Sequence, residues 1–188
     1  MTEQAIRRVM VIRHAEKPAA GEGGILGVDL RGNNDANELS VRGWQRAGGL
    51  VGFFGRSERH EGIEQPRSLY AAGASLGAPS VRAPHTLLPL SEWLGLPIET
   101  RFAKGQEAEL VRAVSAAEGP VLIAWEHKAI VTIANGLTGG TYATPQAWPD
   151  DRFDLVWVFE FADGALRFSQ VAQMLLHGDS EALLPVPS

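Results

Sequence analysis

Val9-Met10-Val11-Ile12-Arg13-His14 is the stretch of this 188-residue chain that decides the fold. Its first four residues are apolar and mostly β-branched, which predicts a strand buried on both faces, as in a parallel sheet covered by helices. Arg13 and His14 follow directly, and open α/β sheets bind ligands at the carboxyl ends of their strands. The stretch therefore predicts an α/β fold and a site that contains a histidine beside a cation.

Two other segments add side chains of the same kinds. A second apolar run, Val121 to Trp125, is followed by Glu126 and His127, and Arg82 opens the segment Arg82-Ala83-Pro84-His85-Thr86. Parallel strands bring their carboxyl ends to one edge of a sheet. Two arginines and two histidines at that edge predict an anion pocket.

The remaining pattern predicts a three-layer α/β/α sandwich with a mostly parallel sheet and an antiparallel hairpin at its edge. Asp163-Gly164 between two extended apolar segments is a hairpin signal. Pro89 predicts that a helix over 86–94 is broken or kinked. We expect strands at 8–13, 68–72, 98–102, 121–125, 154–161 and 165–171, and further helices at 40–56, 106–117 and 128–137, with Trp44 and Phe54 packed on the sheet.

The chain is expected to form a single domain over residues 1–188. Residues 18–38 hold five glycines and no sustained apolar period, which predicts a loop at the active site. Residues 178–188, with two prolines, are expected to form a loosely attached tail.

Composition narrows the class of protein. The chain is 45% hydrophobic and 21% charged, which is typical of a soluble globular domain. It contains no cysteine, which excludes disulfides, thiolate nucleophiles and cysteine-ligated metals. The net charge of -5 disfavours nucleic-acid binding, and neither a membrane span nor a signal peptide is recognisable. We expect a cytoplasmic protein without nucleic-acid or membrane partners.

Four motifs, in order, resemble those of the histidine phosphatase superfamily, also called the phosphoglycerate mutase-like superfamily. The resemblance spans about residues 8 to 138. The motifs are Arg13-His14-Ala15-Glu16-Lys17-Pro18, Leu39-Ser40-Val41-Arg42-Gly43 with Arg46-Ala47, Arg82 to Thr86, and Val121 to His127.

The resemblance implies a metal-independent phosphomonoesterase in which His14 forms a transient phosphohistidine. Arg13 and Arg82 would hold the phosphoryl oxygens and His127 would donate to another oxygen, with Lys17 as a further phosphate contact. Neither a metal nor a cofactor is expected. The expected substrate is a small phosphorylated molecule or a phosphoprotein.

The sequence leaves the identity of the general acid open, because the acidic motifs of the commoner branches of the superfamily are missing. For example, Lys128 follows His127 where one branch has an aspartate. Glu126 is the first candidate, followed by Glu92, and then by Glu16 or no acid at all. The missing motif also leaves two alternatives to the phosphatase. One is a catalytically weak homologue that binds a phosphorylated ligand or protein, and the other is a phosphoglycerate mutase-like phosphotransferase.

Overall fold

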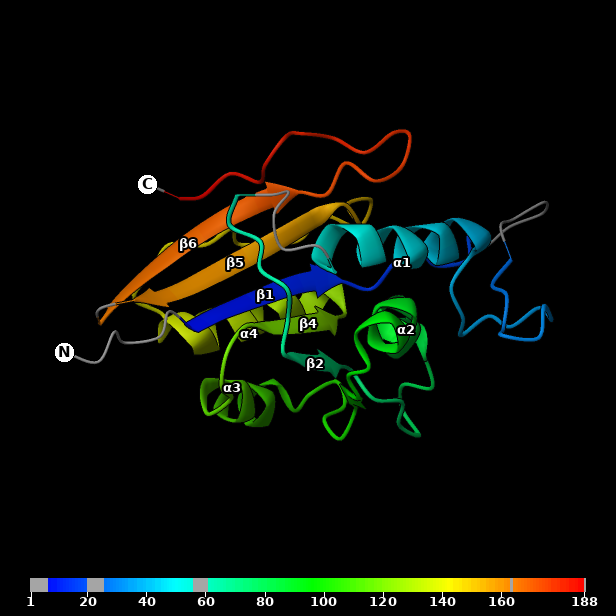
Figure 1. The fold of residues 1–188 in the computed structure, drawn as a ribbon, viewed down its shortest axis with the longest axis horizontal. Helices are drawn as coiled ribbons and strands as arrows, with labels where there is room; N and C mark the ends of the chain where they lie inside the picture. Colours follow the sequence, from blue (N-terminus) through cyan, green and yellow to red (C-terminus); the bar gives the residue numbers. More distant parts are fainter. Residues whose placement is uncertain (1–6, 20–25, 56–60, 163, 188) are drawn as a thin grey trace.

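The computed structural model describes residues 7–19, 26–55, 61–162 and 164–187, in which one six-stranded sheet lies between helices (Figure 1). The strand order is β3-β2-β4-β1-β5-β6. The strands are β1 (Arg7–Arg13), β2 (Ser68–Ala71), β3 (Ile98–Glu99), β4 (Val121–Trp125), β5 (Leu155–Ala162) and β6 (Ala165–Ala172). The helices are α1 (Val41–Phe54), α2 (Arg82–Leu94), α3 (Glu107–Ser115) and α4 (His127–Thr138).

The sheet is mostly parallel, with an antiparallel pair at one edge. β2 pairs in parallel with β3 and β4, and β1 pairs in parallel with β4. β5 runs antiparallel to both β1 and β6, and Gly164, in the turn between β5 and β6, has a φ of 76°, which favours glycine. The predicted edge hairpin is therefore confirmed.

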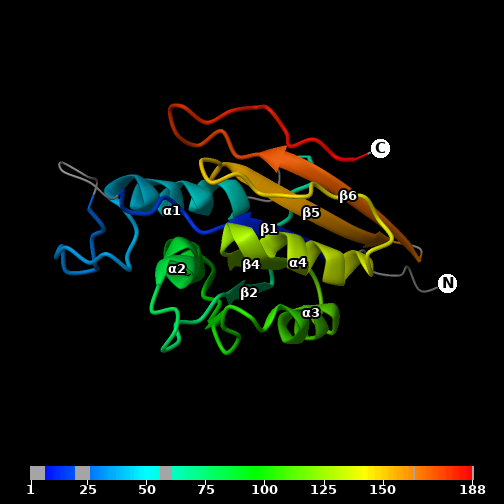
Figure 2. The same ribbon diagram turned by 180° about the vertical axis from the view of Figure 1, so that it is seen from behind.

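Helices α1 and α2 cover one face of the sheet, whereas α3 and α4 cover the other (Figures 1 and 2). Successive residues of a strand point to opposite faces, and β1 supplies both cores: Met10 belongs to the buried cluster that contains Phe54 of α1, and Val11 belongs to the one that contains Ile130 of α4. The predicted three-layer sandwich is thus confirmed. None of the helices in the described segments is both long and apolar enough to span a membrane.

Two local predictions need correction. Helix α2 begins at Arg82 and continues through Pro89 to Leu94, so the helix is not broken at Pro89. Pro89 removes one intrahelical hydrogen bond, but Leu87 and Leu90 on either side of it are fully buried against the sheet, and this packing offsets the loss. β3 holds only two of the residues expected in its strand.

Trp44 also departs from expectation. Its indole does not pack on the sheet as Phe54 does, but lies against Ala15, Leu39 and Ala47. Its Nε1 donates a 2.7 Å hydrogen bond to the carbonyl oxygen of Val28. Trp44 therefore secures the loop before α1 rather than the central core.

The C-terminal segment is attached, contrary to the expected loose tail. The Asp179 side chain is 3% exposed and lies 2.7 Å from the Arg46 guanidinium of α1. Ser180 donates its backbone N–H to Asp154, and Leu184 is buried in the core, where it exchanges hydrogen bonds with Gln170 of β6. Sequence reasoning missed these contacts because two prolines and a glycine dominate the local pattern, whereas the partners are distant in the chain.

Candidate active site

The end of β1 carries His14 to the same edge of the sheet as the end of β4. Arg13 is paired with Trp125, and the next backbone N–H, that of His14, donates a 2.9 Å hydrogen bond to the Trp125 carbonyl oxygen. Thr86 of α2 accepts the Ala15 N–H at 2.8 Å. The three motifs that contain His14, Thr86 and His127 therefore meet at this edge of the sheet.

The start of α1 holds the other side of this loop. The Glu16 carbonyl oxygen accepts hydrogen bonds from both the backbone N–H and the hydroxyl of Ser40, and that hydroxyl caps the helix by accepting from Gly43 N–H at 3.1 Å. A Cβ at position 43 would collide with the Glu16 carbonyl oxygen. The Leu-Ser-x-x-Gly motif thus allows the loop after His14 to approach the helix closely.

His14 is held in one tautomer. Its Nδ1 lies 2.8 Å from the carbonyl oxygen of Ala15, and a carbonyl can only accept, so Nδ1 carries the proton and Nε2 keeps a free lone pair. Burial, together with the charges of Arg13, Arg82 and His127, lowers the pKa of His14 to about 3, although the hydrogen bond to Ala15 opposes this shift. The imidazole is therefore neutral and nucleophilic at physiological pH.

A cavity of about 80 Å³ opens beside this imidazole. Its charged and ionisable lining consists of His14, Arg82, Lys104 and Glu126, and the rest is formed by Ala72, Gly73, Ala78, Ser80 and Ala83. The volume and the mixed lining suit a small polar group such as a phosphoryl group with part of its ester.

Arg82 enters the cavity from the start of α2 and is anchored from the segment before α1. Its Nε donates to the Glu38 carbonyl oxygen at 3.1 Å, and its Nη2 donates to that of Ala36. Burial lowers the pKa of the guanidinium. The end of the predicted active-site loop, 18–38, therefore contacts a cavity residue, whereas its residues 20–25 lie outside the described segments.

Glu126 stands opposite, where β4 passes into α4. Its Oε2 lies 2.8 Å from Lys104 Nζ, whereas its Oε1 is buried and has no hydrogen-bond partner among the residues that the structure describes. Such an oxygen can accept a proton or a hydrogen bond from a molecule in the cavity.

Arg13 is buried on the other side of His14. Its Nη1 donates to the carbonyl oxygens of Pro149, Asp150 and Arg152, and its guanidinium lies 3.8 Å from the ring centroid of Phe153. Nε and Nη2 are buried without a hydrogen-bond partner in the described parts of the chain. Burial lowers the pKa of Arg13 to about 10, so it remains a cation with two uncompensated donors.

His127 lies beside Arg13, at the first residue of α4. Its Nε2 is 2.5 Å from Asp150 Oδ1, and burial lowers the pKa of the imidazole, an effect that Arg13 enhances and Asp150 opposes. Nδ1 is buried and has no partner within the described segments. Arg13, Arg82 and His127 thus lie close enough to His14 to lower its pKa, although neither Arg13 nor His127 lines the cavity.

The other predicted site residues lie apart from the cavity. Lys17 is exposed and is not part of the cavity lining. Glu92 is exposed near the end of α2, about 15 Å along the helix from Arg82. The position of Lys17 does not support a contact with phosphate, and that of Glu92 does not support a role as general acid.

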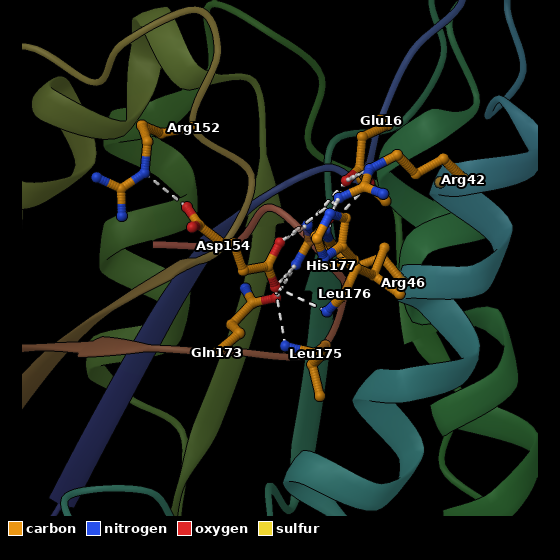
Figure 3. A network of polar contacts seen from close by, with 12 residues as sticks. Glu16, Arg42, Arg46, Arg152, Asp154, Gln173, Leu175, Leu176 and His177 are labelled. Carbon is orange, nitrogen blue, oxygen red and sulfur yellow. Dashed lines mark hydrogen bonds and ion pairs between the residues drawn. The ribbon is translucent and has the colours of Figure 1, made fainter. Parts of the chain in front are cut away.

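Glu16 is committed to a buried ionic network (Figure 3). Arg46 of α1 donates to both of its carboxylate oxygens, at 3.1, 3.0 and 2.8 Å, and also to Gln173 and Asp179. Burial alone would lower the pKa of Arg46, but these hydrogen bonds raise it. Glu16 therefore connects the loop after His14 to α1 and the C-terminal segment, and is not placed to act as an acid in the cavity.

Two residues of the site were not predicted. Lys104 follows the bridge between Gly73 and Ala103 beyond β3, so its place at a strand end was the available signal. Asp150 lies in the loop between α4 and β5, and no local pattern pointed to its contact with His127.

Comparisons with known proteins agree with this geometry at the level of the fold. No protein-family model and no curated protein matches the chain. Among solved structures, the protein histidine phosphatase SixA complexed with tungstate has a TM-score of 0.54 at 15% sequence identity, over 88% of this chain and 97% of that one. The chain therefore has the fold of a histidine phosphatase, as the motifs implied.

Two other solved structures give lower scores. A putative phosphohistidine phosphatase SixA from Agrobacterium tumefaciens has a TM-score of 0.47 at 15% identity, over 88% of this chain and 97% of that one. A phosphoserine phosphatase mutant from Entamoeba histolytica has 0.48 at 11% identity, over 92% and 99%.

Proposed function

We propose that this protein is a metal-independent phosphomonoesterase, acting on small phosphorylated molecules or phosphoproteins, in which His14 is the nucleophile. The observation that carries this proposal is the state of His14. Its Nδ1 proton is held by Ala15, its imidazole is neutral, and it lines the same cavity as Arg82. A neutral imidazole with a free Nε2 can attack phosphorus without activation by a metal.

In the proposed reaction, His14 Nε2 forms a bond to phosphorus while the bond from phosphorus to the ester oxygen breaks. Negative charge spreads over the three equatorial oxygens, and fixed cations and N–H groups stabilise it. Arg82 and the unpartnered Nε and Nη2 of Arg13 are suited to this role. Water then attacks the phosphohistidine and releases phosphate and His14.

Glu126 is the proposed general acid, because it is the carboxylate that lines the cavity together with His14. It would protonate the departing ester oxygen and then accept a proton from the attacking water. Its ion pair with Lys104, whose side chain is half-exposed, must loosen for this.

The test is turnover of p-nitrophenyl phosphate, with and without a chelator, by the native protein, His14→Ala and His177→Ala. We expect chelator-resistant activity that is lost in His14→Ala and retained in His177→Ala, where an exposed histidine is removed. An acid-labile phosphoenzyme should form only when His14 is present. If the native protein binds phosphate without turnover, and Arg82→Ala abolishes binding, a phosphate-binding role replaces the proposed catalysis.

One observation favours a second candidate, the hydrolysis of a phosphoramidate such as phosphohistidine. Glu126 is engaged in an ion pair with Lys104, whereas an acid for an alkyl phosphate must leave that contact to deliver a proton to the ester oxygen. A nitrogen leaving group that carries its own proton needs no such acid. Glu126→Gln separates the two candidates: it should reduce turnover of an alkyl phosphate but spare a phosphoramidate if the second candidate holds.

A further inference from the structure

Asp150 contacts His127 but has no part in the reaction proposed above. The distance from Asp150 Oδ1 to His127 Nε2 is 2.5 Å, although the side chain of Asp150 is 78% exposed. An exposed carboxylate is usually free to move. Its contact with a buried imidazole of the site therefore calls for a reason.

The backbone of this loop is fixed from two sides. The carbonyl oxygens of Pro149, Asp150 and Arg152 accept hydrogen bonds from Arg13 Nη1, at 2.7 to 3.1 Å. Trp148 is buried against Trp157 of β5, and its Nε1 donates to the Arg152 carbonyl oxygen at 2.8 Å. The position of Asp150 relative to Arg13 and His127 is thus set by the fold.

The charges around His127 oppose each other. Arg13 of β1 disfavours a protonated imidazole, as does burial, whereas Glu126 at the start of α4 and Asp150 in the loop favour it. His14 adds no charge because it is neutral. Asp150 is the carboxylate in direct contact with the ring.

We propose that Asp150 is a positioning residue that favours the protonated form of His127, so that its Nδ1–H can donate to a phosphoryl oxygen while Nε2–H faces the carboxylate. Both ring nitrogens of His127, like Nε and Nη2 of the adjacent Arg13, are buried without a hydrogen bond among the described residues, but Nε2 has the Asp150 carboxylate at 2.5 Å whereas Nδ1 has no such contact. An imidazole whose Nε2 carries a proton can donate from Nδ1 only when it is protonated there as well. The proposal rests on the proposed function, because it assigns His127 to the phosphoryl group.

The test compares Asp150→Asn with Asp151→Asn, an exposed neighbour that serves as the control. The first measurement is the titration of the His127 imidazole by NMR, assigned with a His127→Gln variant. We expect the pKa of His127 to fall by about 0.5 in Asp150→Asn, as for an exposed ion pair. It should be unchanged in Asp151→Asn and restored in Asp150→Glu.

The second measurement is the pH profile of kcat for an aryl phosphate. The alkaline limb should move to lower pH in Asp150→Asn, with kcat about threefold lower above the midpoint. An unchanged His127 titration, or an equal shift in Asp151→Asn, would overturn the proposal. A shifted titration with an unchanged pH profile would also overturn it, whereas a shifted titration in a protein without any turnover would refute the proposed function instead.

Discussion

Replacing Asp179 by asparagine removes a negative charge from the buried contact between α1 and the C-terminal segment. The carboxylate accepts hydrogen bonds from two nitrogens of Arg46, at 2.7 and 3.1 Å, and from the backbone N–H groups of Leu175 and Leu176, at 2.8 and 3.0 Å. Removing one partner of a buried ion pair costs roughly 3–5 kcal/mol. Since Arg46 keeps Glu16 as a partner, we expect a loss near the lower end, about 3 kcal/mol.

The loss is measured as the free energy of unfolding in urea at pH 7 and as the melting temperature, which should fall by about 6–12 °C for a chain of this size. Glu181→Gln, an exposed change two residues away, is the control. Although burial raises the pKa of Asp179, the hydrogen bonds from Arg46 lower it overall from 3.8. The charged carboxylate therefore stabilises the fold above pH 3.8, and this contribution is lost as the pH falls through the folded pKa. Equal stability of the two variants at pH 7 would refute the reasoning.

Three further outcomes are expected. Thr86→Val leaves the buried Ala15 N–H without an acceptor and should cost about 1–3 kcal/mol of unfolding free energy by calorimetry, whereas Thr86→Ser should restore most of it. Arg82→Ala removes a cation from the cavity and should lower kcat/KM for an aryl phosphate by roughly 10- to 150-fold, with unchanged stability of the central core. Burial lowers the pKa of His14 from 6.5 to about 3, so the unfolded state binds more protons than the folded state between these pH values. The free energy of unfolding should therefore fall as the pH falls through this range. His14→Asn should reduce this acid sensitivity, measured by urea unfolding at pH 7, 5 and 4.

The layers of the fold were predictable because the sequences of the central strands indicate that both of their faces are buried. β1 and β4 are apolar at every central position, and the structure buries both faces of each. The hairpin was predictable from two extended apolar segments around Asp163-Gly164. The attachment of the C-terminal segment was not predictable. It depends on contacts with Arg46 and Asp154, which are far away in sequence, so no local pattern indicates it.

The cluster around His14 was predictable for a topological reason. Parallel strands place their carboxyl ends together, so residues that follow β1 and β4 must become neighbours. The separate roles of the residues within the cluster were not predictable. Whether a carboxylate faces the cavity, as Glu126 does, or is sequestered by arginines, as Glu16 is, depends on side-chain contacts between separate elements.

The unpartnered donors of Arg13 are an argument for anion binding that is independent of any resemblance. A buried donor without an acceptor costs about 1–3 kcal/mol, and Arg13 has two such donors in the described structure, on a side chain that is 1% exposed. Three carbonyl oxygens already hold Nη1, so the guanidinium is oriented before any ligand arrives. Donors that are fixed in advance need no reorganisation when negative charge develops beside them. Under the proposed function, the stability lost at Arg13 is the cost of holding these donors ready for a phosphoryl group.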